Sequence, residues 1–274
     1  MQPYTGIRFG WRRRGVAGRS VGRWGALGLA ATLAALVVTT VWTVPVDAAA
    51  KLRVERPWPT GAAIRKIEGR EVTFPSVSPF TPAKLYGSSD DLRRTRARGT
   101  LFLPPGRHAP GSVPAVIILH GASGVQWARE MTYARQFAAM GVAALVVDAF
   151  GARREWANGF VDRLIKITET MLVADAYAGL AYLKSVRSVD PGRVAMMGFS
   201  YGAMASMYAM NARFATTFAK ILGVGDTRFA GHVAYYGPCI ARFTDPRTTG
   251  APLLMLYGTR DELIDPERCS EIAQ

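Results

Sequence analysis

The stretch RVAMMGFSYG, residues 193–202, places a serine between two glycines directly after a short apolar run. The run that ends at Phe199 predicts a buried strand, and the residues from about Gly202 to Phe214 predict a helix. A serine on a sharp strand-to-helix turn is exposed at the carboxyl end of its strand, where the helix amino end favours negative charge. Ser200 is therefore the candidate nucleophile; the alternative is an ordinary serine in a glycine-rich turn.

From Val113 onward, short apolar runs alternate with helix-length amphipathic stretches, which is typical of successive strand–helix units around a parallel sheet. The predicted fold class is α/β, with a mostly parallel central sheet and helices on both faces. Two earlier segments are predicted as antiparallel edge strands, 71–74 and 100–103. The other predicted strands are 113–120, 142–148, 193–199, 232–236 and 252–257; the predicted helices are 126–140, 162–186, 202–214 and one from Pro266, with a turn at 190–192.

The composition is that of an ordinary globular chain. Of the 274 residues, 49% are hydrophobic and 20% are charged, which excludes a disordered, collagen-like or multispan membrane protein. The formal net charge is +14, but the basic residues are scattered and not interleaved with aromatic ones, so we expect no nucleic-acid partner. Cys239 and Cys269 lack metal-ligand spacing, and we expect no metal and no cofactor. Whether these cysteines form a disulfide or remain two free thiols stays open.

The amino end has the charge pattern of an export signal. Six arginines among the first 23 residues precede an uncharged stretch at residues 25–46, and small residues suited to cleavage after Ala50 follow. Residues 1–50 are predicted as a signal peptide or, alternatively, as an uncleaved anchor, because the uncharged stretch is long enough to span a bilayer. We expect an exported protein, periplasmic or secreted, or else attached to the inner membrane through 25–46, with its folded domain at 51–274.

A serine nucleophile of this kind works with a carboxylate that orients a basic imidazole, and with amides that stabilise an oxyanion. Residues 253–261, LLMLYGTRD, supply a strand, a turn and a carboxylate, so Asp261 is the candidate acid. Asp265 is the alternative, although it is also well placed as the N-cap of a helix starting at Pro266. The backbone N–H of Tyr201, directly after the nucleophile, is predicted as one oxyanion donor.

These segments resemble the α/β-hydrolase superfamily, and within it the dienelactone hydrolase family. The resemblance covers residues of about 98 to 274. It implies the α/β-hydrolase fold and a second oxyanion donor, the N–H of Ala122, in the loop after the first parallel strand. His120 is then expected to shape that loop and not to act as the base. The segments that carry the resemblance are ILHGASG at 118–124, VDAFG at 147–151, GFSYG at 198–202 and LYGTRD at 256–261.

Two departures from the family pattern limit this resemblance. The dienelactone hydrolases proper use a cysteine nucleophile, whereas Ser200 stands here, so their cyclic-lactone substrate is not implied and serine carboxylesterases are the better comparison. The chain order of the fold is nucleophile, acid, histidine, yet no histidine follows Asp261. Neither His108 nor His232 is expected to replace it. We therefore expect the chain to be a fragment that lacks the last strand and helix and the loop carrying the base.

The sequence predicts a serine hydrolase that cleaves a small-molecule carboxylic ester or lactone through an acyl-enzyme. Trp127 and Phe150 are candidates for an acyl or aromatic pocket, with core packing as the alternative, and Arg153 with Arg154 for binding a substrate carboxylate. Two competing functions remain: a non-catalytic binding protein of the same fold, and an acyltransferase or peptidase on the same machinery. The oligomeric state is left undetermined.

Overall fold

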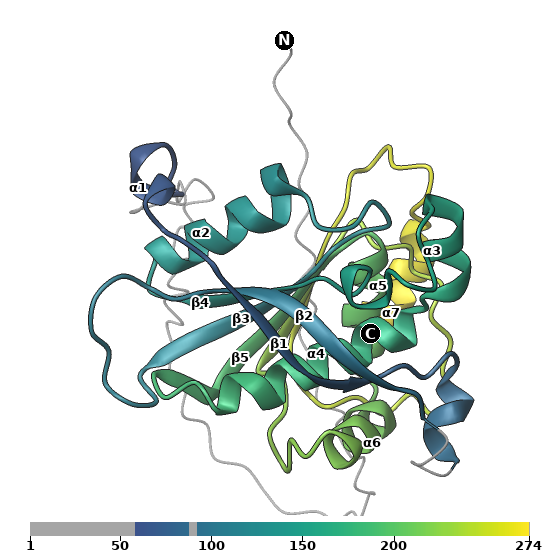
Figure 1. The fold of residues 1–274 in the computed structure, drawn as a ribbon. Helices are drawn as coiled ribbons and strands as arrows, with labels where there is room; N and C mark the ends of the chain where they lie inside the picture. Colours follow the sequence, from purple (N-terminus) through teal and green to yellow (C-terminus); the bar gives the residue numbers. More distant parts are fainter. Residues whose placement is uncertain (1–57, 88–91, 274) are drawn as a thin grey trace, which may run out of the picture. The chain divides into compact units, whose positions relative to one another are not determined.

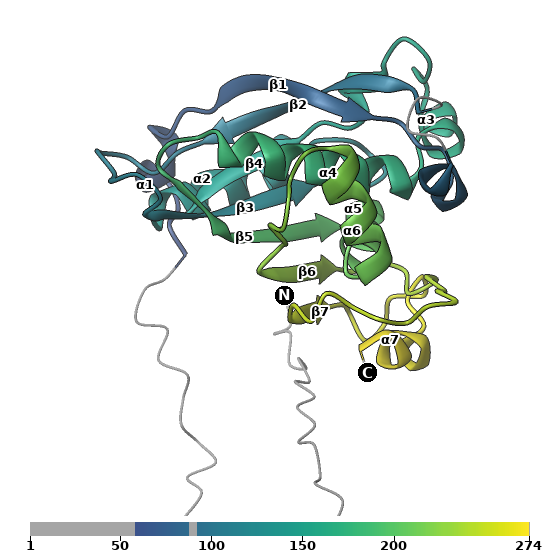
Figure 2. The ribbon, with the colours of Figure 1, turned by 90° about the horizontal axis from the view of Figure 1, so that it is seen from below.

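A sheet with the strand order β1-β2-β4-β3-β5-β6-β7 forms the centre of the structure (Figure 2). The computed structural model describes residues 58–87 and 92–273, and residues 1–50, predicted as a signal or anchor, lie outside them. The strands are β1 (Arg70–Val77), β2 (Arg94–Phe102), β3 (Val113–Leu119), β4 (Ala143–Val147), β5 (Val189–Phe199), β6 (Gly231–Tyr235) and β7 (Leu253–Leu256).

Strand direction follows the prediction of a mostly parallel sheet with an antiparallel leading edge. Strands β4, β3, β5, β6 and β7 are parallel to one another, while β1 pairs with β2 and β2 with β4 in the antiparallel sense. All five residues of β4 are buried, as expected of a strand covered on both faces. The carboxyl ends of the parallel strands therefore meet at one edge of the sheet, where Ser200 follows β5.

Helices cover both faces of the sheet (Figure 1). Along β3, Ile117 and Leu119 belong to the apolar cluster that contains Leu180 of the long helix α4, whereas Ile118 belongs to the cluster that contains Ala138 of α2. Alternate side chains of a strand point to opposite faces, so one apolar run serves both layers. The helices are α1 (Ala62–Arg65), α2 (Thr132–Ala139), α3 (Phe160–Lys166), α4 (Glu169–Lys184), α5 (Tyr201–Tyr208), α6 (Ala212–Ile221) and α7 (Pro266–Ala273).

Two long helices predicted from the sequence are each divided in the structure. The helix predicted at 162–186 is split into α3 and α4, because Ile167 and Thr168 adopt extended backbone angles between them. The helix predicted at 202–214 ends early, and the side chain of Asn211 accepts hydrogen bonds from the amides of Arg213 and Phe214 to start α6. Asparagine bonds to nearby backbone in this way and so favours helix starts over helix interiors.

The turn predicted at 190–192 lies inside β5. This strand already begins at Val189, which pairs with Val113, and the register then shifts before Ala115 pairs with Val194. Between these two pairs β5 has three residues more than β3, and the amide of Gly192 donates to Oδ1 of Asp190 there at 2.9 Å. No helix among the described residues is both long enough and apolar enough to cross a bilayer.

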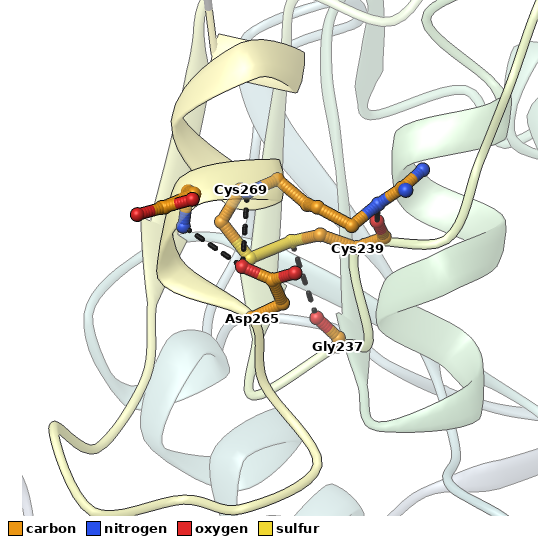
Figure 3. Close-up of a disulfide and its surroundings, with 6 residues drawn as sticks. Gly237, Cys239, Asp265 and Cys269 are labelled. Atoms are coloured by element: carbon orange, nitrogen blue, oxygen red, sulfur yellow. Dashed lines mark hydrogen bonds between the residues drawn. A yellow bond between two sulfur atoms is a disulfide. The ribbon is translucent and has the colours of Figure 1, made fainter.

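Cys239 and Cys269 form a disulfide that ties α7 to the segment after β6 (Figure 3). Both cysteines are buried, in an apolar cluster with Met204 and Met207 of α5. The two residues are 30 apart in the chain, and the segment that they enclose contains β7 and Asp261. The disulfide therefore restrains the part of the chain that carries the candidate acid.

Reduction of this disulfide is expected to lower the free energy of unfolding by about 3–4 kcal/mol, because a closed loop of this length restricts the unfolded chain. The measurement is the urea midpoint of the wild type with and without a thiol reductant. The double variant Cys239→Ser/Cys269→Ser serves as the control, since its midpoint should not respond to the reductant. Equal midpoints for the oxidised and fully reduced wild type would contradict the prediction.

Candidate active site

The turn that carries Ser200 is strained. Ser200 has φ 49° and ψ −110°, between the end of β5 and the start of α5. Non-glycine residues rarely adopt positive φ, and strain of this kind is found at functional sites. The flanking glycines are needed sterically, since a Cβ on Gly198 would lie 2.0 Å from the carbonyl oxygen of Gly202, and one on Gly202 2.6 Å from that of Leu119.

The loop after β3 lies directly against this turn. A Cβ on Gly121 would lie 3.4 Å from the Cβ of Ser200, so the segment leading to Ala122 contacts the candidate nucleophile. Tyr201 is the first residue of α5, and the first amides of a helix have no acceptor within the helix. The structure thus places Ser200 next to Tyr201, the first residue of α5, and close to Gly121, the neighbour of Ala122; the use of these amides as oxyanion donors stays a prediction.

The two candidate acids lie on the segment between β7 and α7. Asp265 accepts hydrogen bonds at Oδ1 from the amides of Glu267 and Arg268, at 3.0 and 3.2 Å, and so caps α7 (Figure 3). Asp261 accepts one from the amide of Leu263 at 3.1 Å. Since β7 is the second strand from β5 in the sheet, Asp261 follows a strand end at the same edge as Ser200. The capping role of Asp265 leaves Asp261 as the candidate acid.

Two of the three histidines lie toward the opposite edge of the sheet. His232 of β6 pairs with Met196, four residues before Ser200, which is about 13 Å along the strand. Burial lowers the pKa of His232 to about 4, so its ring is neutral at pH 7. His108 lies within hydrogen-bond distance of the carbonyl oxygens of Pro104 and Pro105, in the loop before β3 begins.

His120 lies beside the site but supports its loop. Its Nδ1 donates to the carbonyl oxygen of Gly121 at 2.8 Å, and its ring centroid is 4.5 Å from that of Phe150. Burial lowers the pKa of His120, which keeps the imidazole neutral. The ring therefore holds the turn that positions Gly121 against Ser200, the role expected from the sequence.

The two aromatic pocket candidates occupy different surroundings. Phe150 is 4% exposed and packs on His120, which matches the alternative of core packing. Trp127 is 68% exposed, and the guanidinium of Arg135 lies 4.1 Å from its ring centroid. The structure does not assemble these two rings into one enclosed pocket, and a contact of Trp127 with substrate stays a prediction.

The prediction that Arg153 binds a substrate carboxylate is wrong. Its side chain is fully buried and forms an ion pair with the equally buried Asp175, at 2.6 Å between Nη1 and Oδ2 and 3.0 Å between Nη2 and Oδ1. The remaining N–H groups donate to Ser78 Oγ and to the carbonyl oxygens of Ala149 and Val77. All donor positions of this guanidinium are used internally, so none is left for a substrate.

Three further residues near the loop of Gly121 were not predicted from the sequence: Arg129, Glu130 and Tyr236. Glu130 is fully buried, accepts from the amide of Gln126 at 2.8 Å and pairs with Arg129 at 2.8 Å. Arg129 also donates to the hydroxyl of Tyr236 at 3.2 Å, and Tyr236 has a positive φ of 40° directly after β6. Glu130, an acidic residue within the helix predicted at 126–140, was the available signal; the positive φ of Tyr236 has no signal in the sequence.

No group of three or more metal-ligating side chains occurs among the residues that the structure describes. The parallel sheet, the strained Ser200 and the adjoining loop of Gly121 define an α/β-hydrolase. The chain belongs to the dienelactone hydrolase family, whose family model matches residues 98–274.

Similarity to individual proteins is more distant. The quorum-quenching protein AidA of Acinetobacter baumannii (strain MDR-ZJ06) is 32% identical over 126 residues, which cover 45% of this chain and 38% of that protein. A dienelactone hydrolase-like promiscuous phosphotriesterase from metagenomic libraries matches with 19% identity, 74% of either chain and a TM-score of 0.46. Esterase 2 of Thermogutta terrifontis matches with 14% identity, 81% of this chain, 80% of its own and a TM-score of 0.49.

Proposed function

We propose that the protein is a serine hydrolase that cleaves a small-molecule carboxylic ester or lactone through an acyl-enzyme on Ser200. The observation that carries the proposal is the strained turn at the end of β5, held against the loop of Gly121. Strain that raises a hydroxyl at the carboxyl edge of a parallel sheet serves nucleophilic attack, while a structural serine would gain nothing from it.

In the proposed reaction, the hydroxyl oxygen of Ser200 attacks the ester carbonyl carbon. The negative charge that develops on the carbonyl oxygen is stabilised by the amides of Tyr201 and Ala122. The alcohol leaves with a proton, and water then releases the acid from the acyl-enzyme. A general base takes the proton of Ser200 and passes it to the leaving alcohol, and we assign the carboxylate of Asp261 to orient that base. None of His108, His120 and His232 is assigned as this base, because two are remote from Ser200 and the third supports the loop.

The test is covalent labelling of the full-length protein with a fluorophosphonate probe, followed by mass mapping of the labelled peptide. We expect one adduct, on Ser200, and the same labelling in Ser112→Ala, whose exposed serine lies in the loop before β3. An adduct on another residue would remove Ser200 as nucleophile. Absence of any adduct would favour the competing function, a binding protein of the same fold.

The competing acyltransferase and peptidase functions share the acyl-enzyme and differ in the attacking or leaving group. Product analysis separates them: with an ester substrate in water containing an added alcohol, a hydrolase releases mainly the free acid. A transferase would release mainly the new ester, and a peptidase would cleave an amide at a rate comparable to the matched ester.

A further inference from the structure

A groove of about 640 Å³ lies between β2 and the segment 151–158, away from the turn of Ser200. Five of the eleven residues that line it are arginines, and one is a tryptophan. The arginines and the tryptophan of this lining are Arg93, Arg94, Arg96, Arg98, Arg154 and Trp156.

The groove exists because β2 is longer than its neighbour β4. β4 ends at Val147, which pairs with Gly99, and the amide of Asp148 bonds to the carbonyl oxygen of Arg98. From there back to Arg94, β2 pairs with β1 alone, and residues 151–158 lie beside it without strand pairing. Side chains alternate along a strand, so Arg94, Arg96 and Arg98 project from one face of this end of β2.

Among the residues that the structure describes, these arginines outnumber the acidic residues of the groove lining five to one. In the described part of the chain, none of the five lies within 4.0 Å of a carboxylate, and Glu155 is the one acidic residue of the lining. Arg96 donates to the hydroxyl of Thr73, and the guanidinium of Arg93 lies 4.0 Å from the ring centroid of Trp156. Unbalanced cations in a concave site concentrate anions there.

Arginine, more than lysine, suits a discrete anionic group. Its planar guanidinium donates two parallel hydrogen bonds to a carboxylate, phosphate or sulfate. Neighbouring arginines on one face of β2 are about 7 Å apart, so the row matches a group or chain with more than one negative charge. A flat lipid surface would not enter the groove as well as a narrow chain end does.

The groove and Ser200 lie at the same edge of the sheet. Gly99, Val147, Leu119 and Gly198 pair in turn and form one row across β2, β4, β3 and β5. Ser200 lies two residues beyond this row, and Arg98 and Arg96 lie one and three residues beyond it on the antiparallel strand. Three strand spacings, about 14 Å, therefore separate Ser200 from Arg96 and Arg98, and the three residues lie at nearly the same position along the strand direction.

We propose that this groove binds the anionic end of an elongated substrate, a carboxylate, phosphate or sulfate group about 14 Å from the ester that reaches Ser200. The claim that the bound anion belongs to an ester substrate rests on the proposed function. The claim that the groove binds an anionic group rests only on the residues of the groove.

The first experiment measures binding of tripolyphosphate by calorimetry to the full-length protein carrying Ser200→Ala. In this background, the double variant Arg94→Gln/Arg154→Gln is expected to bind tripolyphosphate about 5- to 20-fold more weakly, because each charge-assisted hydrogen bond that is removed lowers the affinity by a small factor. The matched control Arg107→Gln, an exposed arginine in the loop before β3, should leave binding unchanged. Equal binding by the double variant and its parent, or no binding by either, would overturn the proposal.

The second experiment compares two long-chain monoesters, one ending in a carboxylate and one in a methyl group. We expect the wild type to have the higher kcat/KM for the carboxylate ester, and the double variant to lose most of that ratio. If the wild type cleaves both esters without preference, the substrate part fails and the proposed function stands. If the wild type cleaves neither ester, the proposed function fails. The tripolyphosphate experiment then still tests whether the groove binds an anion.

Discussion

Ser200→Ala is expected to lower kcat/KM for a short neutral ester by about four to six orders of magnitude. The size follows from what the serine supplies, since removal of the nucleophile leaves only substrate binding and oxyanion stabilisation. The amides of Tyr201 and of the loop after β3 belong to the backbone and remain in place. A small residual rate above that in water is therefore part of the expected result.

The control for this variant is stability. Alanine and serine meet the same steric penalty at positive φ, so the urea midpoint of Ser200→Ala should equal that of the wild type. The kinetic loss then reports chemistry and not unfolding. A kcat/KM within tenfold of the wild type, in a variant of unchanged midpoint, would show that the strained serine is not the nucleophile.

The strands and the nucleophile turn were predictable because their signals are local. β3, β4 and β5 are short apolar runs, and only a few residues separate the signals for strand, turn and helix around Ser200. Glycines 198 and 202 are required by contacts within this same turn and with the adjacent β3, as the close approach to Leu119 shows. The local pattern and the tertiary contacts agree here, as they do in foldable sequences.

The helix boundaries were less predictable because apolar spacing continues across the breaks. The helix predicted at 162–186 has suitable residues on both sides of Thr168, and the spacing does not reveal the extended residues between α3 and α4. The break before α6 did have a signal, because Asn211 is a favoured N-cap residue. At this position, the preference of asparagine for the N-cap predicts the helix start correctly, whereas the apolar spacing predicts a continuous helix.

The error at Arg153 has a tertiary cause. A charged residue in a loop after a strand is normally exposed, and arginine is rarely buried unless it is paired. Its partner Asp175 is 22 residues away on α4, and the hydroxyl acceptor of Ser78 is 75 residues away. The arginine groove could not be predicted from the sequence for a similar reason, because it forms only where β2 extends beyond the end of the antiparallel β4.

Arg153→Met is expected to lower the free energy of unfolding by about 3–5 kcal/mol, since it leaves the carboxylate of Asp175 buried without its cation. Asp175 would keep one hydrogen-bond donor from this network, the hydroxyl of Ser76, which lies 2.6 Å from Oδ1. One neutral hydrogen bond does not compensate a buried charge. Urea unfolding at neutral pH measures the loss, with the exposed Arg154→Met as the matched control.

The double variant Arg153→Met/Asp175→Leu distinguishes the lost ion pair from lost packing. Removing both charges takes away the unpaired carboxylate, so most of the stability should return, as for other buried pairs replaced by apolar residues. A loss below about 1 kcal/mol in Arg153→Met would mean that water reaches Asp175 and that the pair behaves like one at the surface. A double variant no more stable than Arg153→Met would instead assign the loss to the guanidinium's bonds with Ser78, Ala149 and Val77, which link β1 to the loop after β4.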